Sequence, residues 1–92
     1  AKQYNPYFLS GEINSTVSDV PEAKNRIRQA FAERAEFDEF DGITAKGNSG
    51  DDWWWFNVRT SNTEPLLRLS VEASSESTLN AILEEALIVI RS

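Results

Sequence analysis

The sequence predicts an α+β fold in which two helices cover one face of a mostly antiparallel four-stranded sheet, a two-layer sandwich in the order β-α-β-β-β-α. Three observations lead to this fold. Two segments repeat apolar residues at helical spacing, four others alternate apolar and polar residues, and the chain has only 92 residues. A chain of that length forms one domain with one core. Because a helix and a sheet each bury one apolar face, the two layers are expected to stack.

The N-terminal part of the chain divides after residue 10. Residues 1–10 lack a clear period and contain the turn-forming pair Asn5-Pro6, so we interpret them as an interdomain connector. Residues 11–92 form the domain proper. Its first strand is expected over residues 11–17, where apolar and polar side chains alternate.

The first helix is expected to begin after Asp19. The Asp19 carboxylate can accept hydrogen bonds from the free amides of the first turn, and Glu22 three residues later completes a capping box. Pro21 is tolerated in that turn because its missing N–H costs nothing there. The helix should fade between Arg34 and Asp38. The apolar positions that recur at helical spacing are Ala23, Ile27, Ala30 and Phe31.

Three further strands and a second helix complete the fold. The strands are expected at residues 42–46, 53–59 and 66–73, with a turn-rich loop at residues 47–51. The second helix is expected to begin at residue 74 or 75, where a serine can cap it. The residues expected to face the core from the last two strands are Trp54, Phe56, Val58, Leu67, Leu69, Val71 and Ala73. Those expected to do so from the second helix are Leu79, Ile82, Leu83, Ala86, Leu87 and Ile90.

Composition and charge exclude several classes of function. Nine Lys and Arg residues against fifteen Asp and Glu residues give a net charge of −6, so a phosphodiester backbone or an anionic membrane would repel the chain. It contains no Cys and no His, which excludes disulfides, the usual zinc sites and every Ser-His or Cys-His catalytic arrangement. No apolar run approaches the ~20 residues of a spanning helix. We therefore expect no nucleic-acid or membrane partner, no metal site and no catalytic residue within this chain, and we interpret it as part of a larger protein.

One loop concentrates polar chemistry. Residues 59–65 (Arg-Thr-Ser-Asn-Thr-Glu-Pro) place three hydroxyls, a side-chain amide and a guanidinium at a strand end. Hydroxyls and amides donate hydrogen bonds to anionic oxygens, and an Arg fork adds charge and bidentate geometry, which suits a phosphate. The residues also fit a simple polar hairpin loop, in which Arg59 would pair with Glu64 or Glu72 as a surface ion pair. The spacing leaves both interpretations open.

The same residues resemble a known family. Residues 57–68 (Asn-Val-Arg-Thr-Ser-Asn-Thr-Glu-Pro-Leu-Leu-Arg) look like the phosphate-binding loop of the α-D-phosphohexomutases, in the phosphomannomutase/phosphoglucomutase branch. Residues 10–14 (Ser-Gly-Glu-Ile-Asn) resemble the opening of the same C-terminal domain, and residues 69–73 (Leu-Ser-Val-Glu-Ala) resemble its closing strand. Asn62 stands where many relatives carry Gly, which favours the phosphomannomutase branch. Trp55 is a departure, because that branch often has Arg there.

The resemblance implies a fold and a role. The chain is similar to the fourth domain of four-domain cytoplasmic isomerases, a domain with a TATA-box-binding-protein-like fold. These enzymes interconvert hexose 6-phosphate and hexose 1-phosphate of mannose or glucose through a bisphosphorylated sugar, and other domains hold the phosphoserine and the Mg²⁺. The fourth domain binds the substrate phosphate that is not reacting, and the matching positions here are Arg59, Ser61, Asn62 and Thr63. The resemblance thus implies hexose phosphate and the other three domains as partners, and no isomerase activity for the isolated domain.

Other residues allow competing interpretations. Trp53, Trp54 and Trp55 could stack on a sugar ring, but we favour Trp54 in the core and the flanking pair on a sheet face shared with other domains. Carboxylate pairs and clusters could hold a metal or act as an acid–base dyad, but adjacent residues point in different directions, so we favour a solvated surface. These carboxylates are Asp38, Glu39, Asp41, Asp51, Asp52, Glu84 and Glu85. Glu12 and Glu72 receive no role. The alternative function is a freestanding protein-interaction module that uses the aromatic sheet face.

Overall fold

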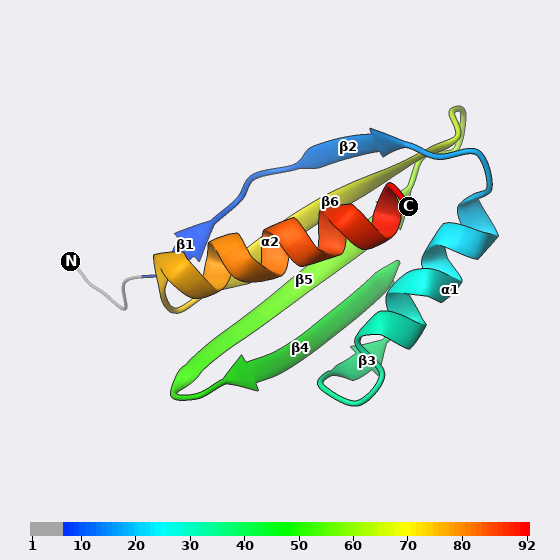
Figure 1. Cartoon of the computed structure of the whole chain (residues 1–92). Helices are drawn as coiled ribbons and strands as arrows, with labels where there is room; N and C mark the ends of the chain where they lie inside the picture. Colours follow the sequence, from blue (N-terminus) through cyan, green and yellow to red (C-terminus); the bar gives the residue numbers. More distant parts are fainter. Residues whose placement is uncertain (1–6) are drawn as a thin grey trace.

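Two layers make up the structure, a computed structural model that describes residues 7–92. One layer is a six-stranded sheet, and the other consists of two helices, which lie in front of the sheet in Figure 1. The strands are β1 (Phe8–Leu9), β2 (Ile13–Thr16), β3 (Glu36–Asp38), β4 (Ile43–Ser49), β5 (Asp52–Thr60) and β6 (Leu66–Ala73). The helices are α1 (Val20–Ala30) and α2 (Glu76–Ile90). The predicted α+β two-layer sandwich is confirmed. Residues 1–6 of the predicted connector lie outside the described residues.

The sheet has six strands rather than the four that the sequence predicts. Its order is β1-β6-β5-β4-β3, β2 also pairs with β6, and all of these pairs are antiparallel. The two strands that the sequence analysis missed, β1 and β3, have two and three residues, which is too short for an alternating pattern to show. β1 joins the sheet because Phe8 and Leu9 pair with Ala73 and Glu72.

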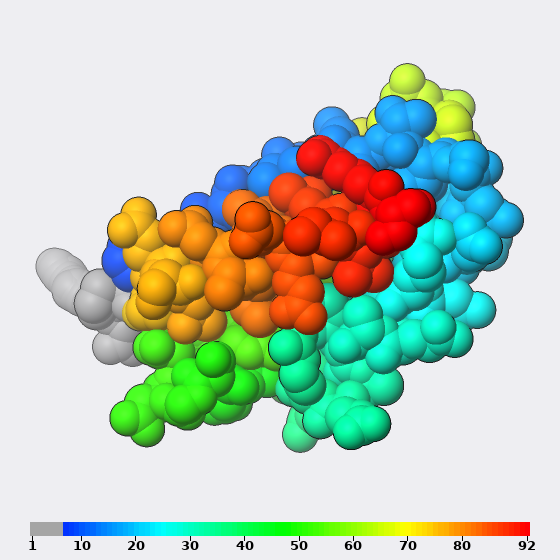
Figure 2. All heavy atoms as spheres, in the orientation of Figure 1, coloured from blue at the N-terminus to red at the C-terminus, as the bar shows by residue number. Residues whose placement is uncertain are grey.

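Both helices pack on the same face of the sheet, and the core lies between the two layers. Phe31, directly after α1, packs against Trp54 and Phe56 of β5 at ring-centroid distances of 5.7 and 4.9 Å. α2 packs against β5 and β6, and Figure 2 shows the surface that the two helices form on this side. The inward side chains of β5 and β6 are buried as their alternation predicts. The opposite face of the sheet, here called the open face, is left without a helix over residues 7–92.

α1 begins where the sequence predicts, but its capping box is only half formed. The Asp19 carboxylate accepts from the backbone amide of Glu22 at 3.1 Å. The Glu22 carboxylate does not return to Asp19 among the described contacts, because it accepts instead from Arg26 Nη1 at 2.8 Å, one turn later on the helix. The helix ends at Ala30, before the predicted end beyond Arg34.

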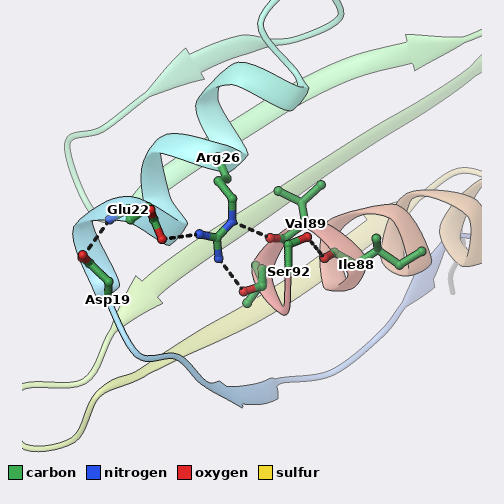
Figure 3. A network of polar contacts seen from close by, with 7 residues as sticks. Asp19, Glu22, Arg26, Ile88, Val89 and Ser92 are labelled. Carbon is green, nitrogen blue, oxygen red and sulfur yellow. Dashed lines mark hydrogen bonds and ion pairs between the residues drawn. The ribbon is translucent and has the colours of Figure 1, made fainter.

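Arg26 connects the two helices (Figure 3). Its Nε and Nη2 atoms donate to the backbone carbonyl oxygens of Val89 and Ile90 at 3.0 and 3.1 Å. These carbonyls belong to the last turn of α2, where C=O groups lack the amide partners four residues on that they have inside a helix. The Ser92 amide also donates to the Val89 oxygen, at the long distance of 3.4 Å. A cation at that end also interacts favourably with the helix dipole. Arg26 therefore fixes α1 against the C-terminal end of α2.

We expect Arg26→Ala to lower the free energy of unfolding by about 1–2 kcal/mol, because the two carbonyls lose a charged donor. Arg28→Ala is the matched control. Arg28 lies on the same helix but pairs with Glu39 at the surface, where ion pairs contribute little. Urea unfolding of the two variants measures the difference, and equal losses would contradict this role of Arg26.

β4 extends further than the sequence predicts. Residues 47–49, which we expected in a loop, continue the strand and pair with β5, so that the turn is confined to the two residues that follow. A Cβ at Gly47 would collide with the Arg34 carbonyl oxygen and the Trp54 ring. Gly47 is therefore a position of close packing, where only the absence of a side chain leaves room for the Arg34 backbone and the Trp54 ring.

Candidate functional site

A groove of about 840 Å³ runs along the open face of the sheet. It is lined by β4, β5, β6 and the segment around β1, and it collects charged side chains of both signs. These charged residues are Glu12, Asp41, Lys46, Arg59, Arg68 and Glu72. The three cations balance the three anions, so the groove is formally neutral in a chain whose net charge is −6.

The register of the sheet places two of these cations side by side. Arg59 of β5 lies directly opposite Arg68 of β6, and Asn14 of β2 lies opposite Arg68 on its other side. Side chains opposite one another on neighbouring strands have Cβ atoms about 5 Å apart, and like charges at this spacing repel. An anion bound near both guanidinium groups would relieve the repulsion. Arg68 was not among the site residues expected from the sequence.

Arg59 is held by two hydrogen bonds. Its Nε donates to Asn57 Oδ1 at 3.1 Å, and its Nη2 donates to Asp41 Oδ2 at 2.6 Å. The ion pair with Asp41 replaces the pairing with Glu64 or Glu72 that the sequence left open. The side chains of Arg59 and Asp41 are 57% and 70% exposed, so the pair contributes little to stability and another anion can displace Asp41 at small cost.

A tight turn between β3 and β4 brings Asp41 to Arg59. The next residue, Gly42, has a φ of +74°, and a Cβ there would lie 2.6 Å from the carbonyl oxygen of Val58. Only glycine combines this left-handed conformation with so close an approach to another strand. The turn therefore lies against β5, and Asp41 reaches an arginine that is 18 residues away in the sequence.

The loop after Arg59 holds two hydroxyls close together. Ser61 Oγ accepts from the backbone amide of Thr63 at 3.3 Å and lies 3.5 Å from Thr63 Oγ1. The Ser61 amide donates to the carbonyl oxygen of Leu66 at 3.3 Å, which closes the base of the loop. Asn62 lies exposed between the two hydroxyls. The structure thus brings Ser61 and Thr63 together on a loop adjoining the groove, whereas Arg59 lines the groove itself.

The three consecutive tryptophans divide between the two faces of the sheet. Trp54 is buried in the core at 2% exposure, as predicted. Trp53 packs beside Tyr7 at a ring-centroid distance of 6.2 Å. Trp55 lines the groove and lies opposite Glu72 on β6. The open face therefore offers an aromatic surface next to a charged one.

Glu72 has a raised pKa. Partial burial, with Trp55 and Leu9 as its neighbours on the adjacent strands, raises the pKa of the Glu72 carboxyl above its ordinary value of 4.5. The folded domain therefore binds this proton more tightly than the unfolded chain does. The stability that this group contributes is fully present below pH 4.5 and is lost as the pH rises through the raised pKa.

Glu72→Gln should accordingly be more stable than the parent chain at pH 7, because the amide keeps the shape of the side chain and carries no charge to desolvate. Below about pH 4 the two should have equal stability, since both side chains are then neutral. Urea unfolding at a series of pH values measures the difference. A gain that persists at low pH, or no gain at pH 7, would contradict the assignment.

Five of the seven carboxylates singled out in the sequence accept hydrogen bonds within the domain, namely Asp38, Glu39, Asp41, Asp52 and Glu85. Asp52 accepts from the Ser74 hydroxyl at 2.9 Å. Glu39 accepts two hydrogen bonds from Arg28, and the guanidinium lowers the pKa of that carboxyl. In the part of the chain that the structure describes, no group of three or more Asp, Glu, His or Cys side chains is placed to hold a metal ion. In that same part, neither helix has the length and apolar character needed to cross a membrane.

Nearly the whole domain matches a known family. The family model described as phosphoglucomutase/phosphomannomutase, C-terminal domain, matches residues 12–89, which include the hydroxyl-rich loop and the strands of the groove. This chain belongs to that family. The resemblance inferred from the motifs in residues 10–14, 57–68 and 69–73 is thereby confirmed.

Individual relatives of this phosphohexomutase domain agree with the family match. The chain is 40% identical over 84 residues to a phosphomannomutase of Methanocaldococcus jannaschii, which covers 91% of this chain and 18% of the relative. It is 42% identical over 84 residues to a phosphomannomutase of Escherichia coli, and this match covers 89% of this chain and 18% of the relative. It is 44% identical over 71 residues to a protein of Xanthomonas campestris described as phosphohexose mutases, and this match covers 76% of this chain and 15% of the relative. The chain therefore spans less than a fifth of the length of these relatives.

Proposed function

We propose that this domain binds the non-reacting phosphate of a hexose phosphate in a phosphomannomutase or phosphoglucomutase. That enzyme would interconvert hexose 6-phosphate and hexose 1-phosphate by phosphoryl transfer through a bisphosphorylated sugar. The observation that carries the proposal is that Arg59 and Arg68 lie opposite one another on β5 and β6, at the end of β5 from which the hydroxyl-rich loop emerges. A substrate phosphate supplies the anion that two neighbouring guanidinium groups require.

The arginines and the loop would share the oxygens of the phosphate. Two of the five N–H groups of Arg59 are bonded within the domain, which leaves three for an anion. Ser61 and Thr63 add hydroxyl donors, and Asn62 adds a side-chain amide. Binding a remote phosphate in this way orients the sugar and contributes binding energy to a reaction carried out elsewhere.

The chemical step in this proposal belongs to other domains of the same chain. Among residues 7–92, no three or more Asp, Glu, His or Cys side chains are grouped to hold a metal ion, and we propose that another domain holds the Mg²⁺ that the family resemblance implies. The partners are a mannose or glucose phosphate and the three other domains, in the cytoplasm. The domain by itself would bind phosphate but would not isomerise the sugar.

A titration of this chain with mannose 6-phosphate, followed by the backbone amide shifts in NMR spectra, tests the proposal. The largest shifts are expected at Arg59, Ser61, Asn62 and Thr63, with weak affinity because one domain forms only part of the site. Unphosphorylated mannose is the matched control and should leave these amides unchanged. Shifts confined to the aromatic residues of the open face would overturn the proposal and favour the freestanding interaction module.

Asp41→Asn should tighten the binding of mannose 6-phosphate by up to about fivefold, the equivalent of one exposed ion pair. The phosphate must displace the Asp41 carboxylate from Arg59 Nη2 or share the guanidinium with it, and an uncharged amide competes less well. Asp51→Asn is the control, because it removes the same charge at the opposite end of β5, and it should leave the Kd unchanged. Weaker binding by the Asp41→Asn chain would contradict this prediction.

A further inference from the structure

We infer that Asn57 is a positioning residue for Arg59, an inference that rests on the proposed phosphate-binding role of Arg59. Asn57 lies two residues before Arg59 on the open face of β5. Its Oδ1 accepts from Arg59 Nε at 3.1 Å, and its Nδ2 donates to the Asp41 carbonyl oxygen and to Thr44 Oγ1, each at 3.0 Å. Asn57 thus ties the arginine to β4 and to the turn that precedes it.

The partners of Asn57 determine which way its amide faces. The Asp41 carbonyl oxygen can only accept a hydrogen bond, so it must meet the NH₂ group of Asn57. Arg59 Nε can only donate, so it must meet Oδ1. A flipped amide would place acceptor against acceptor and donor against donor, and both hydrogen bonds would be lost. The Asn57 oxygen is therefore committed to Arg59.

The contact at Nε orients the whole guanidinium, because the group is planar and its five donors form a fixed fork. Nε of Arg59 donates to Asn57, and Nη2 donates to Asp41. The two Nη1 hydrogens and the second Nη2 hydrogen are left for contact with a phosphate. Holding a long side chain in this orientation before the ligand arrives reduces the entropy lost on binding.

A double-mutant cycle separates this positioning role from a merely structural one. Asn57→Ala should raise the Kd for mannose 6-phosphate about fivefold in a chain with Arg59, the effect of one lost hydrogen bond. In an Arg59→Lys chain the same change should raise the Kd less than about 1.5-fold, because Lys has no Nε donor for Asn57 to hold. Asn48→Ala is the matched control, because it makes the same change at an exposed position of β4 that pairs with Trp53, away from Arg59. It should leave the Kd unchanged in both backgrounds.

The Nε–H signal of Arg59 in nitrogen–proton NMR spectra gives a second readout that does not depend on phosphate. Its exchange with water should be several-fold faster in the Asn57→Ala chain than in the parent chain, because the proton loses its acceptor. The backbone amide spectrum of the same sample shows whether the variant is folded. Unchanged Nε–H exchange in a folded variant would overturn the inference.

The binding outcomes distinguish failure of the inference from failure of the proposed function. If Arg59→Ala weakens phosphate binding but Asn57→Ala does not, only the positioning inference is overturned. Equal rises in Kd in the parent and Arg59→Lys backgrounds would also overturn it, because Asn57 would then act independently of the arginine. If Arg59→Ala and Arg59→Lys both bind mannose 6-phosphate as the parent does, the proposed phosphate role of Arg59 fails, and the inference fails with it.

Discussion

Phe31→Ala should lower the free energy of unfolding by about 3–5 kcal/mol, a large part of the 5–15 kcal/mol that stabilises a typical domain. The Phe31 side chain is fully buried. Its ring packs against Trp54 and Phe56, and the guanidinium carbon of Arg34 lies 4.7 Å from its centroid. The ring fills space between α1 and the sheet, so its removal leaves a cavity that the neighbouring side chains cannot fill without moving a helix. Urea unfolding followed by tryptophan fluorescence measures the loss.

Phe40→Ala is the matched control, because it makes the same change of side chain at a position that is 98% exposed. We expect its effect on the free energy of unfolding to lie within about 0.5 kcal/mol of zero. The loss in the free energy of unfolding for Phe31→Leu should lie between those for Phe31→Ala and Phe40→Ala, since leucine keeps part of the buried volume. A loss for Phe31→Ala no larger than that for Phe40→Ala would contradict the packing of α1 against β5.

Arg59→Ala should lower the kcat/KM of the full-length enzyme by roughly 10- to 150-fold, the range for a lost charged hydrogen bond. Ser61→Ala should lower it about fivefold, because one neutral hydroxyl contributes about 1 kcal/mol. The difference arises because the guanidinium of Arg59 offers three free donors and a charge, whereas the Ser61 hydroxyl also accepts from the Thr63 amide within its own loop. Steady-state kinetics with mannose 1-phosphate and glucose 1-phosphate measure both effects.

The control for this experiment is Arg28→Ala, which removes the same charge from α1 in the helix layer. It should leave kcat/KM within about twofold of the parent enzyme, since screened surface charges act weakly over such distances. Equal kinetic constants for the Arg59→Ala enzyme and the parent would refute the phosphate contact. A Ser61→Ala effect larger than that of Arg59→Ala would reverse the proposed order of importance.

Much of the candidate site could be predicted from short stretches of sequence. The motif at residues 57–68 pointed to Arg59, Ser61, Asn62 and Thr63 as residues of one phosphate loop, and the family match covers this stretch. The partners of Arg59 could not be predicted in the same way. Asp41 lies in the turn between β3 and β4, and Arg68 lies on β6. Their positions beside Arg59 depend on the register of the strands, because a shift of one residue turns a side chain to the opposite face.

Local sequence was sufficient for the features that depend on near neighbours along the chain. Alternation along β5 and β6 identified their buried faces, because a strand has a period of two whatever it pairs with. The helix start at Asp19 was predicted because its carboxylate bonds an amide only three residues away. The start of α2 was predicted for the same reason, because the Ser75 hydroxyl accepts from the amide of Thr78, three residues later.

The assembled fold was needed for contacts between distant parts of the chain. The edge strands β1 and β3 are too short to carry a pattern of their own and form because β6 and β4 offer unpaired backbone groups beside them. Arg26 reaches Val89 across 63 residues, and Arg59 reaches Asp41 across 18. Such contacts depend on the register of the strands and on how the helices pack. Neither is encoded in a local period, because many registers and packings satisfy the same apolar pattern.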